Sequence, residues 1–144
     1  MTTISPTTKG RPLNTPVPAG SGQRIRVVLG KLRFDAHDVG ARYIMRKLVD
    51  AGMEVIFVRF ALVGELVEAA LQEDAHVIGV SSLTGGHVTV AKNLVKAVKD
   101  AGLDDRLLMI GGVIADEDVQ RLREMGIAGV FGPGADAEAI VQFI

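Results

Sequence analysis

Asp35 and His37 are the residues of this sequence whose types and spacing are best suited to chemistry. A carboxylate two residues from an imidazole can accept the Nδ1–H hydrogen bond, which fixes the tautomer and leaves Nε2 as a base or a metal ligand. Lys31, at the end of a candidate strand, can pair with Asp35. An Asp-x-His pair also occurs in ordinary surface loops beside an incidental ion pair, so the spacing alone leaves both interpretations open.

Three further segments carry a serine or paired glycines. Ser81 can donate a hydrogen bond to a ligand or cap a helix, and Gly111-Gly112 allows close approach of the backbone to a ligand or makes a plain turn. Gly132-Pro133-Gly134, ahead of a candidate helix, can receive a phosphate or turn the chain.

The other two histidines are more ordinary. His76 lies at the start of a candidate strand, where a structural role is expected, and His87 begins a helix, where it either caps the helix or lines a pocket. Three histidines so far apart, without spaced carboxylates, argue against a zinc site.

The segments that must position these residues alternate between β-branched runs and helical periodicity. The predicted strands are Arg24–Leu29, Glu54–Arg59, His76–Val80, Leu107–Ile110 and Ile127–Phe131. Each is followed by a helical segment, the fourth with Asp116 as its expected N-cap and the last over residues 135–143. Gly52, Gly102 and Gly126 supply helix ends.

Five strands alternating with five helices predict an α/β fold, a flavodoxin-like (Rossmann-like) parallel sheet in the order 2-1-3-4-5 with helices on both faces. A (β/α)8 barrel needs about 200 residues or more. In such open sheets, ligands bind beyond the carboxyl ends of the strands, where the winding reverses. The polar and glycine-rich segments are all placed after strands, so they are expected at this one edge.

Composition narrows the function classes. The 144 residues carry a formal charge of −1, no cysteine and 4% aromatic residues. This excludes a general nucleic-acid binder, a disulfide scaffold and an aromatic stacking platform. No run approaches the roughly 18 apolar residues of a membrane span. We expect a cytoplasmic protein with a Pro/Thr-rich, disordered extension over residues 1–22 and one domain over residues 23–144.

Related folds that share this topology need other residues. A receiver domain requires an acidic pair after strand one and an aspartate after strand three, where this chain has Lys31 and Ser81. A flavodoxin requires a hydroxyl-rich loop after strand one, and a dinucleotide-binding enzyme requires Gly-x-Gly-x-x-Gly there. None of these motifs follows the first strand.

The motifs Asp35-x-His37-x-x-Gly40, Ser81-x-Leu83 and Gly111-Gly112, in this order and spacing, resemble the cobalamin-binding domain of adenosylcobalamin-dependent mutases and methionine synthase. The resemblance covers residues 24–144. Lys31, Gly79–His87 and Val130–Gly134 resemble the acyl-CoA mutase branch in particular, as found in separate small subunits of isobutyryl-, 2-hydroxyacyl- or methylmalonyl-CoA mutases.

The resemblance implies a specific site. His37 would replace dimethylbenzimidazole as the lower ligand of cobalt, with Asp35 and Lys31 extending it into a relay. The displaced nucleotide tail would lie between sheet and helices, past Ser81, Leu83 and Gly111-Gly112. The residues expected to contact the cofactor are, besides these, Ala36, Asp38, Val39, Gly40, Gly85, Gly132, Pro133 and Gly134.

The resemblance also implies a partner. A large mutase subunit would bind the acyl-CoA and hold it above the cofactor for a radical 1,2-rearrangement. The two subunits would form an α2β2 hetero-oligomer, with a GTPase chaperone as a further partner. The catalytic residues would lie in the large subunit, and this chain would be inactive without it. The alternatives are a corrinoid carrier for methyl transfer, which usually has a helical cap domain, and a cobalamin-dependent sensor, which needs an output module.

The sequence departs from the family pattern in two places. The family usually has glycine at Arg33, often glycine at Ala36 and arginine at Val39, so the contacts at the corrin edge and with the partner are in question. The stretch Phe60–Glu65 also lacks the usual Thr-Pro-Glu entry to the second helix.

Overall fold

A single parallel sheet forms the centre of the molecule, with strand order β2-β1-β3-β4-β5. The computed structural model describes residues 24–32, 39–82, 86–132 and 137–144. The strands are β1 (Arg26–Leu32), β2 (Glu54–Phe60), β3 (Val77–Ser82), β4 (Leu107–Gly112) and β5 (Gly129–Phe131). The predicted flavodoxin-like order is therefore confirmed.

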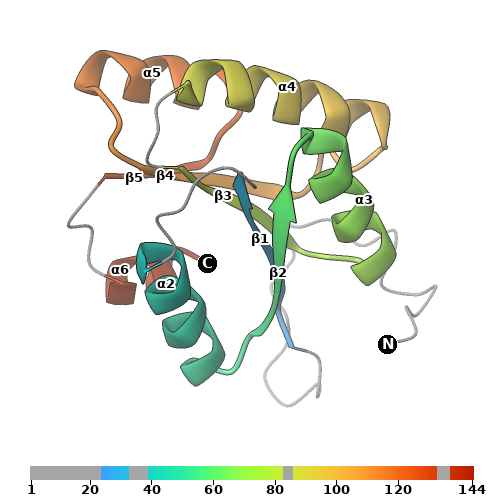
Figure 1. Cartoon of the computed structure of the whole chain (residues 1–144), viewed down its shortest axis with the longest axis vertical. Coiled ribbons are helices and arrows are strands. Elements are labelled where there is room, and N and C mark those ends of the chain that lie inside the picture. The colour runs from blue at the N-terminus through green and yellow to red at the C-terminus, as the bar shows by residue number, and fades with distance from the viewer. Residues whose placement is uncertain (1–23, 33–38, 83–85, 133–136) are drawn as a thin grey trace.

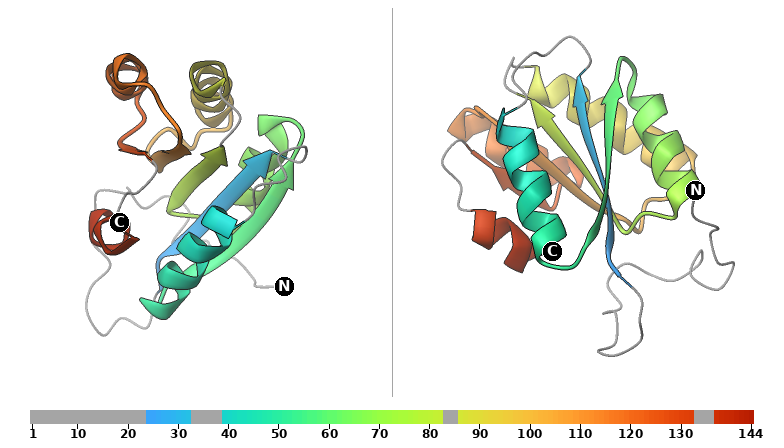
Figure 2. Two further views of the ribbon diagram at one scale, coloured as in Figure 1. Left: turned by 60° about the vertical axis from the view of Figure 1, so that its left-hand side comes forward. Right: turned by 60° about the horizontal axis from the view of Figure 1, so that its bottom comes forward.

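In the described part of the chain, five helices cover the two faces of this sheet (Figures 1 and 2). They are α2 (Val39–Asp50), α3 (Val63–Glu73), α4 (His87–Asp100), α5 (Asp116–Met125) and α6 (Ala137–Phe143). Figure 2 shows α4 and α5 on one side of the sheet and α2 and α6 on the other. The separation follows from right-handed crossovers, because the winding reverses after β2.

Two apolar cores result, one on each face. The larger core includes Ile78, Val80 and Ile110 with residues of α3, α4 and α5. The smaller core joins Val27, Val77 and Met109 to α2 and α6. Successive strand residues point to opposite faces, so alternate strand positions supply the two cores.

The strand boundaries differ from the predicted ones at both ends. β1, β3 and β5 begin one or two residues later than expected, at Arg26, Val77 and Gly129. β1 continues to Leu32, β3 to Ser82 and β4 to Gly112, because the pairing persists through Lys31↔Ser81 and Ser82↔Gly112. Lys31, Ser81 and the diglycine were expected in loops after the strands, and that part of the prediction is wrong. These polar and glycine residues interrupt the apolar runs from which the strands were predicted. Their backbone groups nevertheless continue the pairing with the neighbouring strands.

Helix ends follow the expected chemistry, except at the start of α5. Gly52 and Gly126 adopt positive φ values of 93° and 111° after α2 and α5, as predicted. The N-cap of α5 is Ala115, so the assignment of Asp116 as cap is wrong, and Asp116 is the first residue of the helix. At α3, Glu65 accepts hydrogen bonds from the N–H groups of Ala61 and Leu62 at 2.9 Å each. These bonds cap the helix although the Thr-Pro-Glu entry usual in the family is missing here.

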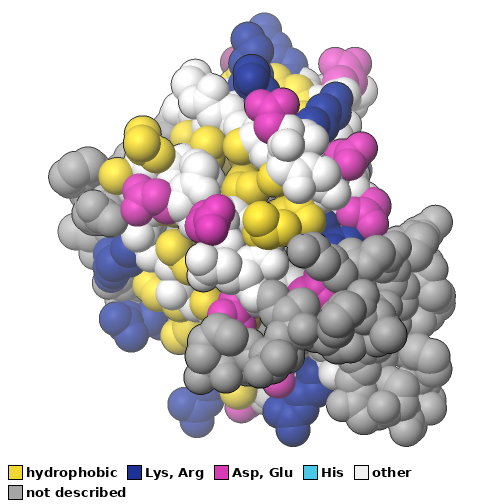
Figure 3. Space-filling view, turned by 90° about the vertical axis from the view of Figure 1, so that its right-hand side faces the viewer, with side chains coloured by type: hydrophobic (Ala, Val, Ile, Leu, Met, Phe, Trp, Pro, Cys, Tyr) yellow, Lys and Arg dark blue, Asp and Glu magenta, His cyan; other side chains and the backbone are white. Residues whose placement is uncertain are grey.

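The surface carries charges of both signs. On the face shown in Figure 3, the Lys and Arg side chains of the described residues are interspersed with Asp and Glu. None of the helices in the described ranges is long and apolar enough to cross a membrane.

Candidate functional site

Two rows of side chains cross the face of the sheet that α2 and α6 cover. The row at the carboxyl ends runs, by strand register, through Lys31, Ser81, Gly111 and Phe131. The next row runs through Leu29, Gly79, Met109 and Gly129. Gly111 in the first row and Gly79 in the second interrupt the side chains that would otherwise fill the space below the helices.

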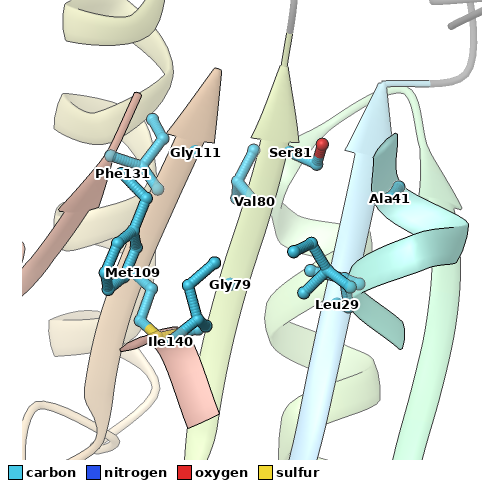
Figure 4. A pocket seen from close by; sticks show the side chains of 11 residues that line it. Leu29, Ala41, Gly79, Val80, Ser81, Met109, Gly111, Phe131 and Ile140 are labelled. Atoms are coloured by element: carbon cyan, nitrogen blue, oxygen red, sulfur yellow. The ribbon is translucent and has the colours of Figure 1, made fainter. Parts of the chain in front are cut away.

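A pocket of about 60 Å³ lies where the side chains are missing (Figure 4). Among the described residues that line it, Ser81 is the one with a polar side chain. The pocket is lined by Leu29, Ala41, Ile44, Gly79, Val80, Ser81, Met109, Ile110, Gly111, Phe131 and Ile140. The described lining is therefore an apolar slot between sheet and helices, with the hydroxyl of Ser81 at the carboxyl edge of the sheet.

Gly79 and Gly111 keep this slot open. A Cβ at residue 111 would meet nothing closer than the backbone oxygen of Phe131 at 3.6 Å, and a Cβ at residue 79 would touch Leu29 and Met109 at 3.4 Å. Both are tolerable contacts, so packing within the chain does not demand glycine at either position. The absence of side chains there instead leaves room for a ligand.

Two other strand glycines have a packing role instead. A Cβ at residue 30 would lie 2.6 Å from Leu66 Cδ1, on the opposite face of the sheet. A Cβ at residue 129 would lie 2.7 Å from the ring of Phe143, which packs edge-on against Phe131 with 5.5 Å between centroids. These glycines are required by neighbouring side chains of the protein itself.

Lys31 is completely buried, with 0% of its surface exposed. It lies beside Ser81 in the row at the carboxyl ends, near the end of β1. A buried ammonium group is costly unless it is paired or hydrogen-bonded. Its ammonium group is therefore expected to be held by groups of the protein and not by solvent.

Several predicted site residues do not line the pocket. Gly112, with φ of 150°, ends β4 next to the lining residue Gly111, and Gly40 and Gly132 are exposed. Val39 begins α2. The remaining predicted residues, together with Arg33, lie outside the described residues: Asp35, Ala36, His37, Asp38, Leu83, Gly85, Pro133 and Gly134.

The two described histidines have different surroundings. His76 accepts a hydrogen bond at Nδ1 from the backbone N–H of Arg26 at 3.0 Å, which agrees with the expected structural role. His87 is 5% exposed and is the first residue of α4, after the N-cap Gly86. His87 is therefore not the cap, nor is it among the residues that line the described pocket.

Sequence reasoning missed most of the pocket wall. Only Ser81 and Gly111 were predicted, whereas Gly79 and the apolar residues from α2, β4, β5 and α6 were not. Gly79 interrupts a buried apolar strand, and a strand glycine is a recognised mark of close approach by a ligand or another backbone. The apolar residues carry no signal of their own, because they look like ordinary core.

Comparison with known proteins gives this pocket its context. Residues 25–142 match the B12 binding domain family. The pivalyl-CoA mutase small subunit of Xanthobacter autotrophicus is 38% identical over 121 residues, which is 83% of this chain and 81% of that protein. Methylmalonyl-CoA mutase of Cereibacter sphaeroides is 36% identical over 124 residues, which is 85% of this chain and 18% of that enzyme. The chain thus spans less than a fifth of that longer mutase.

Solved structures show the same fold. A cobalamin-binding protein from Desulfitobacterium hafniense has a TM-score of 0.70 at 24% identity, covering 84% of this chain and 58% of that one. The receiver domain of a Francisella response regulator has a TM-score of 0.64 at 12% identity, covering 83% and 93%. The fold alone therefore does not separate cobalamin-binding proteins from receiver domains, whereas the match to the B12 binding domain family does. The chain belongs to the B12-binding domain family.

Proposed function

We propose that this chain binds adenosylcobalamin in the base-off form, with His37 as the lower ligand of cobalt. The observation that carries the proposal is the apolar slot kept open by Gly79 and Gly111 at the carboxyl edge of the sheet. The segment that joins β1 to α2 contains Asp35 and His37. β1 lines the slot through Leu29, and α2 lines it through Ala41. The chain connectivity therefore supports a site in which the ligand histidine and the slot serve one cofactor.

In this proposal the protein's own residues hold and tune the ligand. Asp35 accepts the Nδ1–H of His37, which keeps the imidazole neutral and directs Nε2 to the metal. Lys31, buried at the end of β1, places a positive charge behind that carboxylate. The glycines leave room for the nucleotide tail, and Ser81 offers it a hydroxyl at the edge of the slot.

The remaining predicted contacts belong to the same proposal. Gly40, Gly112 and Gly132 lie at the carboxyl edge of the sheet, at the start of α2 or the ends of β4 and β5, from which they would contact the corrin or the tail. The other proposed contacts are Ala36, Asp38, Val39, Leu83, Gly85, Pro133 and Gly134.

The chain is further proposed to be the small subunit of a heteromeric acyl-CoA mutase. Its similarity to a pivalyl-CoA mutase small subunit along 81% of that protein supports this assembly. When bound, adenosylcobalamin supplies the radical chemistry for a 1,2-rearrangement of the acyl-CoA carbon skeleton. A large subunit would hold the acyl-CoA in an α2β2 complex, with a GTPase chaperone as a further partner and the cytoplasm as the location.

Titration of the purified chain with cobalamin tests the cofactor role. Absorption and cobalt(II) EPR spectra are expected to show base-off cobalamin with a histidine nitrogen on cobalt in the wild type. His37→Ala is expected to remove the nitrogen signal while far-UV circular dichroism stays unchanged. Identical cobalt spectra for both proteins would exclude His37 as the ligand.

Co-purification tests the assembly. The tagged chain is expected to retain a large acyl-CoA-binding subunit, and the pair is expected to rearrange an acyl-CoA only when adenosylcobalamin is present. Retention of a methyltransferase in its place would favour the corrinoid-carrier alternative.

A further inference from the structure

The slot is narrow, with a volume of about 60 Å³. A flat aromatic base placed between the sheet and the helices would press on the side chains that line this space. A lining side chain that can turn aside would therefore make room for the base.

Several lining residues cannot widen the slot by turning a side chain. Val80 and Ile110 direct their side chains into the core on the opposite face of the sheet. Phe131 is fixed by its edge-on contact with Phe143, at an interplanar angle of 78°, and the missing side chain of Gly129 makes room for that contact. These residues form rigid walls.

Met109 differs from these walls. It has an unbranched side chain with three rotatable bonds, the type of residue that adapts most easily to a changing cavity. It is 4% exposed and belongs to the same core cluster as Ile140 of α6. Its terminal methyl and Leu29 Cδ1 each lie 3.4 Å from the point where a Cβ at residue 79 would stand, so these two side chains cover the floor that Gly79 leaves open (Figure 4). Of the two, only Met109 is unbranched.

We propose that Met109 is a movable floor of the slot, which turns away from Gly79 to admit the aromatic base of a corrinoid's nucleotide tail. The inference rests on the proposed function and deepens it. It adds to the slot a positioning residue that does not touch cobalt.

The test compares two corrinoids on the purified chain. Cobalamin carries the nucleotide tail, whereas cobinamide lacks it, so the ratio of their Kd values measures what the tail contributes to binding. Met109→Leu and Met109→Ile introduce isomeric side chains of equal volume, of which only isoleucine is branched at Cβ and stiff at χ1. Isoleucine also suits a strand, so both variants are expected to fold.

Met109→Ile is expected to weaken cobalamin binding by about tenfold, with the Kd for cobinamide unchanged. Met109→Leu is expected to retain cobalamin binding within about threefold, because its χ1 stays free to rotate. Met53→Ala is the matched control: Met53 lies in the same core cluster and is 9% exposed, but it does not line the slot. It is expected to lower the denaturation midpoint and leave the ratio of Kd values unchanged.

Two contrary results are distinguishable. Equal cobalamin affinity in Met109→Ile and Met109→Leu would overturn the movable floor while leaving cobalamin binding intact. Failure of the wild type to bind either corrinoid, alone or with its large subunit, would overturn the proposed function and this inference together.

Discussion

Ser81 of β3 and Gly111 of β4 are register partners at the carboxyl edge of the sheet, so a hydroxyl stands beside a position without a side chain. Both line the slot between the sheet and the helices α2 and α6. This pairing places a polar group at the opening of an otherwise apolar space, which is an arrangement suited to a ligand with a flat apolar part and a polar attachment.

Gly111→Val is expected to close the slot without unfolding the chain. A Cβ at this position meets only the Phe131 backbone oxygen, at 3.6 Å, while a branched side chain would project into the space proposed for the tail. Cobalamin affinity should fall by at least about tenfold, and cobinamide affinity should persist. Isothermal titration with both ligands measures this, and normal cobalamin binding by the variant would move the tail elsewhere.

Gly30→Ala is expected to have the opposite profile. Its Cβ would lie 2.6 Å and 2.9 Å from the two terminal methyl carbons of Leu66, in the core on the far side of the sheet. Overpacking of this kind costs about 1–3 kcal/mol of unfolding free energy. Urea denaturation measures the loss, and the folded variant should still bind cobalamin. Full stability would show that Leu66 adapts without cost.

Asp35→Asn is expected to weaken histidine ligation without abolishing it. An amide cannot stabilise the polarised imidazole as a carboxylate does, and changes to such supporting groups typically cost about 10–100-fold in metal affinity. The comparison of cobalt(II) EPR titrations for wild type, Asp35→Asn and His37→Ala should give three graded results. Equal affinity in the wild type and Asp35→Asn would remove Asp35 from the proposed relay.

Asp74→Asn is expected to destabilise the fold at the edge opposite the site. Arg106 Nη2 donates to Asp74 Oδ1 at 3.1 Å, and the two side chains are only 5% and 7% exposed. Removal of one charge from a buried pair typically costs about 3–5 kcal/mol, and the additional contact of Arg106 with Asp105 places the expected loss at the lower end. Thermal and urea unfolding measure this change.

Lys96→Ala provides the comparison for that ion pair. Lys96 and Asp100 form an exposed i,i+4 pair with side chains 78% and 67% exposed. Such pairs contribute only about 0.3–0.5 kcal/mol. A loss in Asp74→Asn no greater than that in Lys96→Ala would show that the buried charge is stabilised by other groups.

The sequence by itself determined the layered architecture and the family. The alternation of β-branched runs with helical periodicity depends on local backbone preference and on which face is buried, and both are present in every segment. The motifs with Asp35, Ser81 and Gly111 separated this chain from receiver domains, which share its fold with a TM-score of 0.64. Fold-level geometry does not make that distinction, because it depends on a few polar side chains.

Only the tertiary structure decided where the strands end and which residues enclose the slot. Lys31, Ser81 and Gly112 interrupt hydrophobic patterns, but their backbone groups still pair with neighbouring strands, and this pairing depends on partners far away in the sequence. Gly30 and Gly79 look alike in the sequence, yet one faces Leu66 and the other faces the slot. The side on which a glycine opens space is determined by the pleat of the assembled sheet and by the helix above it, and neither is a property of the residue itself.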